Sequence, residues 1–358
     1  MTPTENRPTG WDLLACLATT PEIYIQKLDL VRNTALLVRF SEAQFDAASF
    51  LDDRMLGNNI PSQWVSLQSV IERANRVTNS RPLHFIFHSG HVGSTLVSRL
   101  LEVAGGVLAL REPFLLRQLA DAHDVVGLPE SYLAHETLDQ LFRVVLKFWS
   151  QGFSETTAVI VKATSSAARI APSILEKLPL SRGICVNVRA EIYVTTLLAN
   201  PNLLTELKLL APERIRRLQS FGMPPPPPLY TMSFGELAAM GWLVGVWSQQ
   251  KVVAAAGGRV ITVDFDALLA NVRHEMGRVL QHFGLPCDEA ILTRVAVSPV
   301  LTRYSKAQEH AYSAEFRANV LAESRARHHA EIRKGLQWIA RATGLHAEAA
   351  RVVGEAGG

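Results

Sequence analysis

Residues 83–95 constrain the fold most, because they read as a strand, a glycine turn and the start of a helix. The segment is Leu-His-Phe-Ile-Phe-His-Ser-Gly-His-Val-Gly-Ser-Thr, and a helical pattern follows it. The first turn of a helix offers unpaired backbone amides and the positive end of the helix dipole to an anion. Gly90 and Gly93 let the backbone approach closely, and Ser94 and Thr95 add hydroxyl donors. The segment therefore predicts a cradle for a phosphate or sulfate group.

The loop departs from the nucleotide triphosphate loop, which requires a glycine, four residues, and then Gly-Lys-Ser/Thr. With Gly93 as the second glycine, His88 stands at the first glycine and Ser94 at the lysine. Because that lysine reaches the β- and γ-phosphates, its absence argues against ATP or GTP hydrolysis. A tight strand-to-helix turn that binds nothing is the alternative for this segment taken alone.

Size, charge and cysteine usage narrow the class of protein. The 358 residues can form one α/β domain with additions, or two small domains. A net charge of +3 and a pI of about 8.8 suit an anionic small ligand but do not argue for nucleic acid. Cys16, Cys185 and Cys287 show no metal or disulfide spacing, so we expect reduced thiols in a cytoplasmic protein. With no secretory core and no run of about 18 apolar residues, we expect no membrane association.

Strand and helix patterns alternate from Pro82 onward. The expected strands are Leu83–Phe87, Val107–Leu110, Ala158–Lys162, Gly183–Val188 and Arg259–Val263. The expected helices include Glu136–Ser150, Ala171–Lys177, Glu191–Ala199 and Ser233–Ala255. Alternation of this kind predicts a three-layer α/β fold, in which helices flank a mostly parallel sheet. Ligands of such sheets bind past the carboxyl ends of the strands, where the glycine loop lies.

The flanking segments add to this core. Residues 1–80 are expected to form an N-terminal α+β extension, residues 81–312 the core domain, and residues 313–358 a helical segment that packs on it. Within the extension, the patterns predict a loose stretch at 1–10, a hairpin at 28–40, and helices at 42–53 and 62–78. Five consecutive prolines at 224–228 indicate a rigid connector. Trp242 and Trp247 in the helix that follows are expected to be core residues.

Charged residues follow three of the expected strands. Glu112 comes just after the second strand, Lys162 ends the third and Arg189 ends the fourth. Parallel strands bring their carboxyl ends to one edge, so these side chains are expected near the glycine loop. A partly desolvated carboxylate there could take a proton from a hydroxyl nucleophile. A guanidinium there suits a bidentate phosphate contact.

Residues 82–310 resemble the sulfotransferases that use 3′-phosphoadenylyl sulfate (PAPS), in a divergent bacterial form. Residues 89–95 resemble the family's 5′-phosphosulfate loop, although His91 and Val92 stand where the family has Lys or Arg and then Ser. Residues 263–269 and Gly284-Leu285-Pro286 resemble its Tyr-Glu-Asp-Leu segment and terminal Gly-Leu-Pro. There, Asp264 or Asp266 is expected to cap a helix start and Gly284 a helix end.

Two further segments resemble those that hold the 3′-phosphate in this family. Arg189, with Thr195 or Thr196 two turns later, resembles the strand-Arg…Ser pattern, with Ala190-Glu191 at the family's Asp-Pro. Arg303-Tyr304-Ser305-Lys306 resembles the late loop that closes over the same phosphate.

The resemblance implies a P-loop NTPase-like fold of the sulfotransferase type and a site for PAPS. Glu112 would act as base, and His91 and Lys162 would stabilise the developing charge. The implied donor-binding residues are Ser89, Gly90, His91, Val92, Gly93, Ser94, Thr95, Arg189, Thr196, Arg303, Ser305 and Lys306.

The implied reaction moves a sulfuryl group to a hydroxyl or amine of a small-molecule or peptide acceptor and leaves adenosine 3′,5′-bisphosphate (PAP). No metal is expected, because the histidines show no ligand spacing. The sequence does not indicate the acceptor, and a homodimer is one of the possible assemblies. Residues 114–135 and 200–232 are expected to cover the acceptor. Two alternatives remain: a P-loop small-molecule kinase, and a non-catalytic nucleotide-binding or scaffold protein of the same fold.

Overall fold

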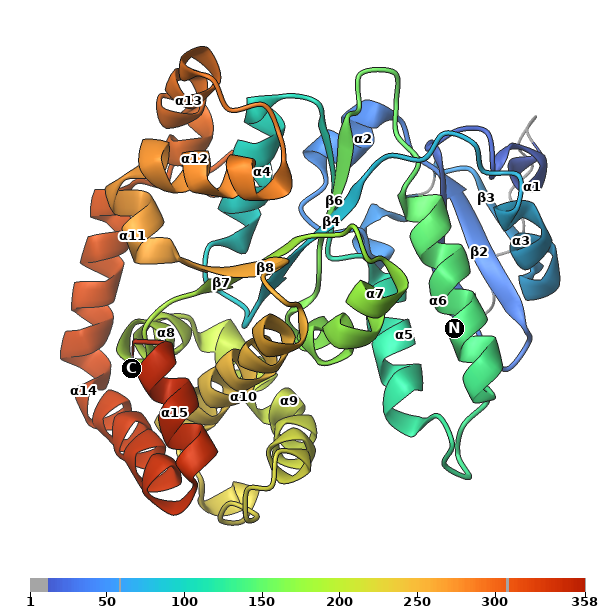
Figure 1. Cartoon of the computed structure of the whole chain (residues 1–358). Coiled ribbons are helices and arrows are strands. Elements are labelled where there is room, and N and C mark those ends of the chain that lie inside the picture. Colours follow the sequence, from blue (N-terminus) through green and yellow to red (C-terminus); the bar gives the residue numbers. More distant parts are fainter. Residues whose placement is uncertain (1–11, 58, 307–308, 358) are drawn as a thin grey trace.

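A five-stranded parallel sheet forms the centre of the molecule (Figure 1). The computed structural model describes residues 12–57, 59–306 and 309–357, so the expected loose stretch at 1–10 lies outside the described residues. The strand order is β5-β6-β4-β7-β8. The strands are β4 (Leu83–His88), β5 (Val107–Arg111), β6 (Ala158–Lys162), β7 (Gly183–Asn187) and β8 (Val260–Asp264). The expected strands are thus confirmed, with ends that shift by one residue at most.

Helices cover both faces of this sheet, as the continuous apolar strands require. Phe85 and Phe87 face a core that includes α5 (Phe114–Val125), α6 (His135–Trp149) and α7 (Ala171–Lys177). Ile86 and Ile184 face the opposite core, which includes α4 (Ser94–Ala104), α11 (Phe265–Ala270), α12 (Val272–Phe283) and α13 (Glu289–Ala296). The structure confirms the expected three-layer α/β fold.

The strand order places a switch point beside the glycine loop. The chain leaves β4 through α4 towards β5 on one side of the sheet, and leaves β7 towards β8 on the other side. Connections that diverge between neighbouring strands open a crevice at their carboxyl ends, where ligands of such sheets bind. The loop after β4 and the start of α8 (Ala190–Leu198) border this crevice.

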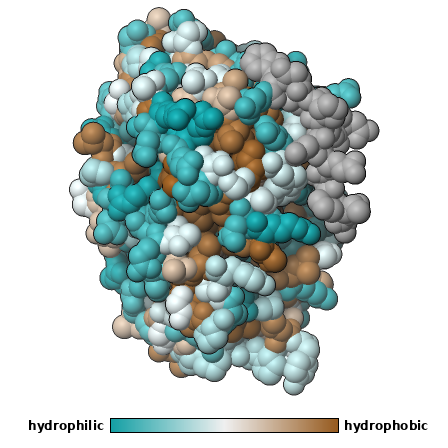
Figure 2. Space-filling view, turned by 90° about the vertical axis from the view of Figure 1, so that its right-hand side faces the viewer, coloured by the Kyte–Doolittle hydropathy of each residue, from teal (hydrophilic) through white to brown (hydrophobic). Residues whose placement is uncertain are grey.

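The N-terminal extension forms a second, antiparallel sheet of three strands, β1 (Ile23–Asp29), β2 (Thr34–Arg39) and β3 (Ser62–Ser66), with the short helix α1 (Leu13–Cys16) beside it. The expected hairpin is therefore confirmed. On the side of the molecule that carries this sheet, hydrophilic and hydrophobic residues are interspersed (Figure 2).

Two helix predictions in the extension are correct only in part. The helix expected at 42–53 ends early, as α2 (Glu42–Ala47), because the chain then turns extended and docks beside β5. There the Leu51 amide donates to the Arg111 carbonyl at 2.7 Å, before the turn η1 (Asp53–Met55). The helix expected at 62–78 begins with β3, whose residues pair with β2, and only α3 (Leu67–Ala74) is helical. The Ser66 side chain caps that helix and ends the strand.

The C-terminal half adds a group of helices that pack on one another beyond the carboxyl ends of β4 and β7 (Figure 1). They are α8, α9 (Pro201–Ser220), α10 (Phe234–Ala255), α14 (Ala314–Leu345) and α15 (Ala347–Glu355). Trp242 and Trp247 of α10 are fully buried, as expected. The expected caps also form, since Asp264 accepts from the Ala267 amide at 2.7 Å and Gly284 ends α12 with a φ of 72°. No helix among the described residues is long and apolar enough to span a membrane.

Candidate functional site

The loop after β4 presents an unpaired row of backbone amides. Gly90, His91 and Gly93 have φ angles of 91°, 54° and 78°, so the backbone curls into a concave turn of the kind that binds anions. Gly93 is the N-cap of α4, and no side chain caps this helix end. The amides without an acceptor among the described residues include those of Val92, Gly93, Ser94 and Thr95. The buried Thr95 hydroxyl also lacks a partner there, which fits a group that binds a ligand.

Gly93 is required for packing as well as for backbone conformation. A Cβ at this position would overlap the ring of Phe265, which follows β8. A Cβ at Gly90 would meet only Ser165, at an ordinary 3.4 Å. The loop is therefore held between the start of α4 and the start of α11.

His88 ties the loop to the neighbouring strand as a neutral side chain. Its Nδ1 accepts from the Gly90 amide at 3.0 Å, so the proton is on Nε2, which donates to the Ala163 carbonyl at 2.8 Å. Complete burial lowers the pKa of His88 to about 3, with a further lowering by Lys162 and an opposing effect of Glu112. Both ring nitrogens are used, so His88 positions the loop and is not free to act as a base. No local sequence pattern indicates this role, because it depends on a contact with Ala163, the residue that follows β6.

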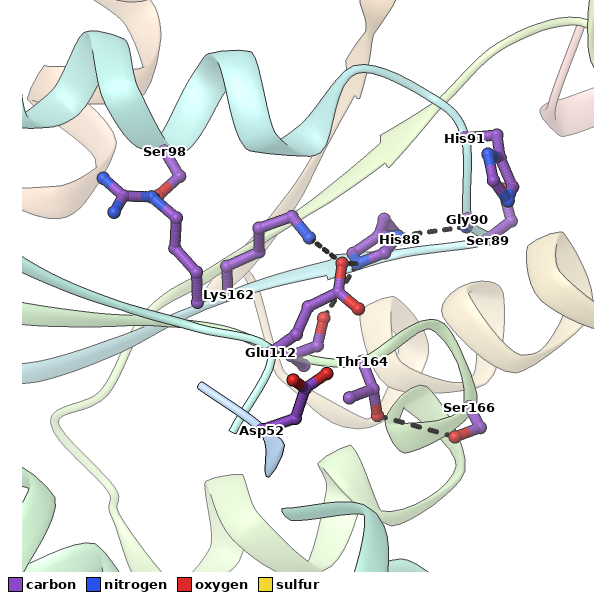
Figure 3. Close-up of polar contacts among 12 residues, drawn as sticks. Asp52, His88, Ser89, Gly90, His91, Ser98, Glu112, Lys162, Thr164 and Ser166 are labelled. Atoms are coloured by element: carbon purple, nitrogen blue, oxygen red, sulfur yellow. Dashed lines mark hydrogen bonds and ion pairs between the residues drawn. The ribbon is translucent and has the colours of Figure 1, made fainter. Parts of the chain in front are cut away.

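Glu112 and Lys162 form an ion pair where β5 and β6 end. Figure 3 shows Lys162 and His88 directed at the Glu112 carboxylate, with Asp52 beside it. The Lys162 side chain is fully buried, whereas Glu112 keeps 19% of its side chain exposed. Burial would raise the pKa of Glu112, but the charge of Lys162, with that of Lys306, lowers it to about 2. Burial lowers the pKa of Lys162 to about 8 against the opposing effect of Glu112. The carboxylate is thus ionised, oriented and partly open to solvent.

A cavity of about 510 Å³ opens beside the loop. Its walls come from the loop, from α8, from α11, from residues 301–306 and from the start of α14. The lining includes three cationic side chains, Arg303, Lys306 and Arg317, and no Asp or Glu among the described residues. Four aromatic rings also line it, those of Phe265, Tyr304, Tyr312 and Phe316. The cavity suits an elongated anion that carries a flat ring.

Most of the donor-binding residues that we predicted line this one cavity. They are His91, Val92, Gly93, Ser94, Thr95, Thr196, Arg303, Ser305 and Lys306. Ser89 and Gly90 lie at the start of the loop outside the lining, and so do Glu112 and Lys162 at the ends of β5 and β6. Arg189 is the exposed N-cap of α8 at the carboxyl end of β7 and is also outside the lining.

Several lining residues were missed by the sequence analysis. Tyr312, Phe316 and Arg317 follow the predicted late loop, and Phe265 lies in a segment that we assigned to the fold alone. Arg317 pairs with Asp266 at 2.7 Å, which joins the start of α14 to α11. A basic residue one turn into a helix, far along the chain from its acidic partner, gives no signal in the sequence.

His91 contacts α9 and lies apart from the Glu112 group. Its Nε2 lies 3.7 Å from Oε2 of Glu206, and 22% of its side chain is exposed. In Figure 3 the ring points away from Glu112 and Lys162. The loop is thereby linked to the helix that covers the crevice.

The N-terminal extension holds one wall of the cavity in place through Arg99 of α4. The Arg99 Nε donates to the Ser305 carbonyl at 2.8 Å, and its Nη2 to the Ser49 hydroxyl at 3.0 Å. Ser49 in turn donates to the Lys306 carbonyl at 2.9 Å. A second buried arginine, Arg111, donates to the Ala48 carbonyl at 2.8 Å. Residues 303–306 are thus positioned by a segment that lies about 250 residues earlier in the chain.

No family model and no curated protein matches this sequence. Solved structures with which the chain aligns are sulfotransferases. The sulfotransferase domain from the curacin biosynthetic pathway is 14% identical, with 78% of this chain and 98% of that chain covered and a TM-score of 0.39. A mouse sulfotransferase complexed with PAP is 9% identical over 81% of this chain and 95% of that chain, with a TM-score of 0.40.

A sulfotransferase from Mycobacterium tuberculosis is 16% identical over 73% of this chain and 80% of that chain, with a TM-score of 0.38. At TM-scores this low, these likenesses carry no argument about chemistry. Within the described ranges no three His, Cys, Asp or Glu side chains gather as a metal site would require.

Proposed function

We propose that this chain is a sulfotransferase that moves a sulfuryl group from PAPS to a hydroxyl or amine of a small-molecule or peptide acceptor. The cavity beside the loop carries the proposal. It combines unpaired helix-start amides, three cationic side chains and four aromatic rings, with no carboxylate in its described lining. A donor with an anionic tail, a separate phosphate and a flat base matches each of these features.

In this proposal the two anionic ends of the donor bind at different walls. The amides of residues 91–95, with Ser89 and Gly90 behind them, hold the 5′-phosphosulfate. Thr196, Arg303, Ser305 and Lys306 hold the 3′-phosphate, and we propose Arg189 as a further ligand from the end of β7. The aromatic rings of the lining provide a stacking surface for the adenine.

The transfer itself forms one bond and breaks another. The acceptor oxygen or nitrogen attacks the sulfur, the bond between sulfur and the bridging oxygen breaks, and PAP leaves with the electron pair. The acceptor proton passes to the Glu112 carboxylate, which Lys162 holds ionised and oriented. Glu112 becomes neutral as it takes up this proton, so in this proposal the ammonium of its partner Lys162 can then stabilise the developing charge, together with His91 and the loop amides. Fixed amides and cations of this kind supply most of the stabilisation in group transfers of such anions.

A P-loop kinase fits the cavity less well. It would need a lysine where Ser94 stands, and carboxylates near the phosphates to hold Mg²⁺. A non-catalytic nucleotide-binding protein would share the cavity, and only turnover separates it from an enzyme. The three cysteines are free thiols, which supports the proposal of a cytoplasmic setting.

The test is transfer from ³⁵S-labelled PAPS, in EDTA, to a broad panel of hydroxyl and amine acceptors. We expect labelled product and release of PAP from the wild type. The Glu112→Gln variant should bind PAP as the wild type does and lose transfer by about a hundredfold or more. Tight PAP binding without transfer to any acceptor would favour the non-catalytic alternative, and no PAP binding would end the proposal.

A further inference from the structure

Arg214 of α9 is a buried cation without a partner in the described part of the chain. The residue is only 9% exposed, and its Nη1 is inaccessible and makes no hydrogen bond. No side chain of the described ranges forms an ion pair with it. Buried charges in proteins are paired, because an unpaired one loses its hydration without compensation. The missing partner is therefore expected to be an anion that this chain does not supply.

Neighbouring arginines show how the same region pairs its buried cations. Arg217, one turn further along α9, forms an ion pair with Glu213. Arg169, on the adjoining turn η2 (Ser165–Ile170), pairs with Asp121 at 2.7 Å and with Asp124 at 2.9 Å. The three arginines are about equally buried. Arg214 differs from Arg169 and Arg217 because it has no ion-pair partner among the described residues.

The position of Arg214 is fixed by α10. A Cβ at Gly241 would lie 2.8 Å from the Arg214 Cζ, so the absence of a side chain at Gly241 leaves room for the guanidinium. The packing of α9 on α10 therefore holds the guanidinium against the α10 backbone at Gly241.

Arg214 also lies close to residues that contact the loop. Burial raises the pKa of Tyr193, and the charge of Arg214 opposes that rise. The Tyr193 hydroxyl donates to the Ser89 carbonyl at 3.1 Å. Glu206 has its pKa lowered by His91 first and by Arg214 as well, but its contact is with His91, at 3.7 Å. Arg214 is outside the lining of the donor cavity.

We propose that Arg214 binds an anionic group of the acceptor, a carboxylate, phosphate or sulfate, so that the substrates are acidic hydroxyl or amine compounds. This inference rests on the proposed function, since it assigns α9 to the acceptor side of the loop. A guanidinium binds each of these oxyanions with paired hydrogen bonds, which fixes the orientation of the molecule that carries them. The acceptor nucleophile would then be held by its distant charge while it faces the donor.

The first test is the melting temperature of ligand-free variants. Arg214→Met removes an uncompensated buried charge and keeps the volume, so we expect the melting temperature to rise by about 2 °C or more. Arg217→Met leaves Glu213 with only the 4.0 Å contact to Arg169 and should lower the melting temperature. Arg216→Met, an exposed residue of the same helix, should leave it unchanged. A fall for Arg214→Met like that for Arg217→Met would make Arg214 a structural residue and overturn the proposal.

The second test uses acetate, phosphate and sulfate as probes, with chloride at the same ionic strength as the reference. PAP is added to saturation so that it fills the donor cavity and the probes report on another site. We expect at least one probe to raise the melting temperature of the wild type and of Arg216→Met, and to have no effect on Arg214→Met. No response to any of the three probes, or an equal response of Arg214→Met, would overturn the proposal.

The two proposals fail in different ways. If PAP does not bind to the wild type, the proposed function fails. The probes then remain informative without nucleotide, because the comparison of Arg214→Met with Arg216→Met still isolates the contribution of Arg214.

Discussion

The Glu112 carboxylate accepts from the ammonium of Lys162 at the point where β5 and β6 end side by side. The same two residues also interact through the backbone, since the Glu112 amide donates to the Lys162 carbonyl at 2.7 Å. Glu112 leaves the strand with a φ of 49°, a left-handed conformation that turns its side chain towards Lys162 and His88. The proposed base is thus held by two contacts with one residue of the neighbouring strand.

The Glu112–Lys162 pair should show strong energetic coupling. Lys162→Met leaves the largely buried Glu112 carboxylate without its cation and should cost about 2–4 kcal/mol of unfolding free energy. The double variant Glu112→Gln, Lys162→Met removes both charges and should cost clearly less than the sum of the single changes. Urea unfolding of the four proteins measures the coupling, and additive costs would show that the two side chains do not interact.

His88 should make the protein less stable as the pH falls. Its folded pKa of about 3 lies below the ordinary 6.5, so the unfolded chain binds a proton in this window that the folded chain excludes. Stability that is present at neutral pH is therefore lost as the pH drops through 6.5 towards 3, by up to about 1.4 kcal/mol per pH unit.

Urea unfolding at several pH values measures this dependence. His88→Gln should lower the slope by about one proton, whereas His274→Gln, with 70% of its side chain exposed, should leave the slope unchanged. Equal slopes for the wild type and His88→Gln would contradict the neutral, buried state.

The two loop glycines should differ in their tolerance of alanine. Both have positive φ angles, which cost an alanine about 1–2 kcal/mol. Gly93→Ala must also displace the Phe265 ring, which should add about 1–3 kcal/mol, whereas Gly90→Ala has room. In a Phe265→Ala background, Gly93→Ala should no longer carry this added cost in unfolding free energy. Equal costs at the two glycines would contradict the close packing of Phe265 on the loop.

The N-terminal extension should affect nucleotide binding through Arg99. Arg99→Met and Ser49→Ala release the backbone of residues 305–306 and should weaken PAP binding by about tenfold. Arg294→Met is the matched control, because Arg294 donates to the Val103 and Ala104 carbonyls at the far end of the same helix. Calorimetric titration of the folded variants with PAP measures this loss. An equal loss of affinity in Arg294→Met would contradict a specific role for Arg99.

The sequence predicted the strands of the parallel sheet well but the elements of the extension only in part, for a physical reason. The five strands of the sheet are short apolar runs that end in polar residues, so their pattern is local. Strand β3 depends on pairing with β2, and the end of α2 depends on docking against β5, so tertiary contacts override the helical pattern there.

The residues of the candidate site also fall into those that local motifs predict and those that depend on contacts between distant segments. The loop, Thr196 and residues 303–306 were predicted from motifs, and the structure brings them to one cavity. The partners of charged residues could not be predicted, because they join distant segments: Lys162 with Glu112, and Arg99 with Ser305. Arg189 matched its motif but stands outside the cavity lining, and its role in binding PAP stays a prediction.

Calorimetric titration of the wild type with PAP in EDTA tests the central claim most directly. We expect one molecule to bind per chain with micromolar affinity or better, with a loss of more than tenfold in Lys306→Met and in Arg189→Ala. Unchanged affinity in Arg189→Ala would remove that residue from the site alone. No binding of PAP, or binding of ATP only when Mg²⁺ is present, would contradict the claim that this cavity holds a sulfuryl donor.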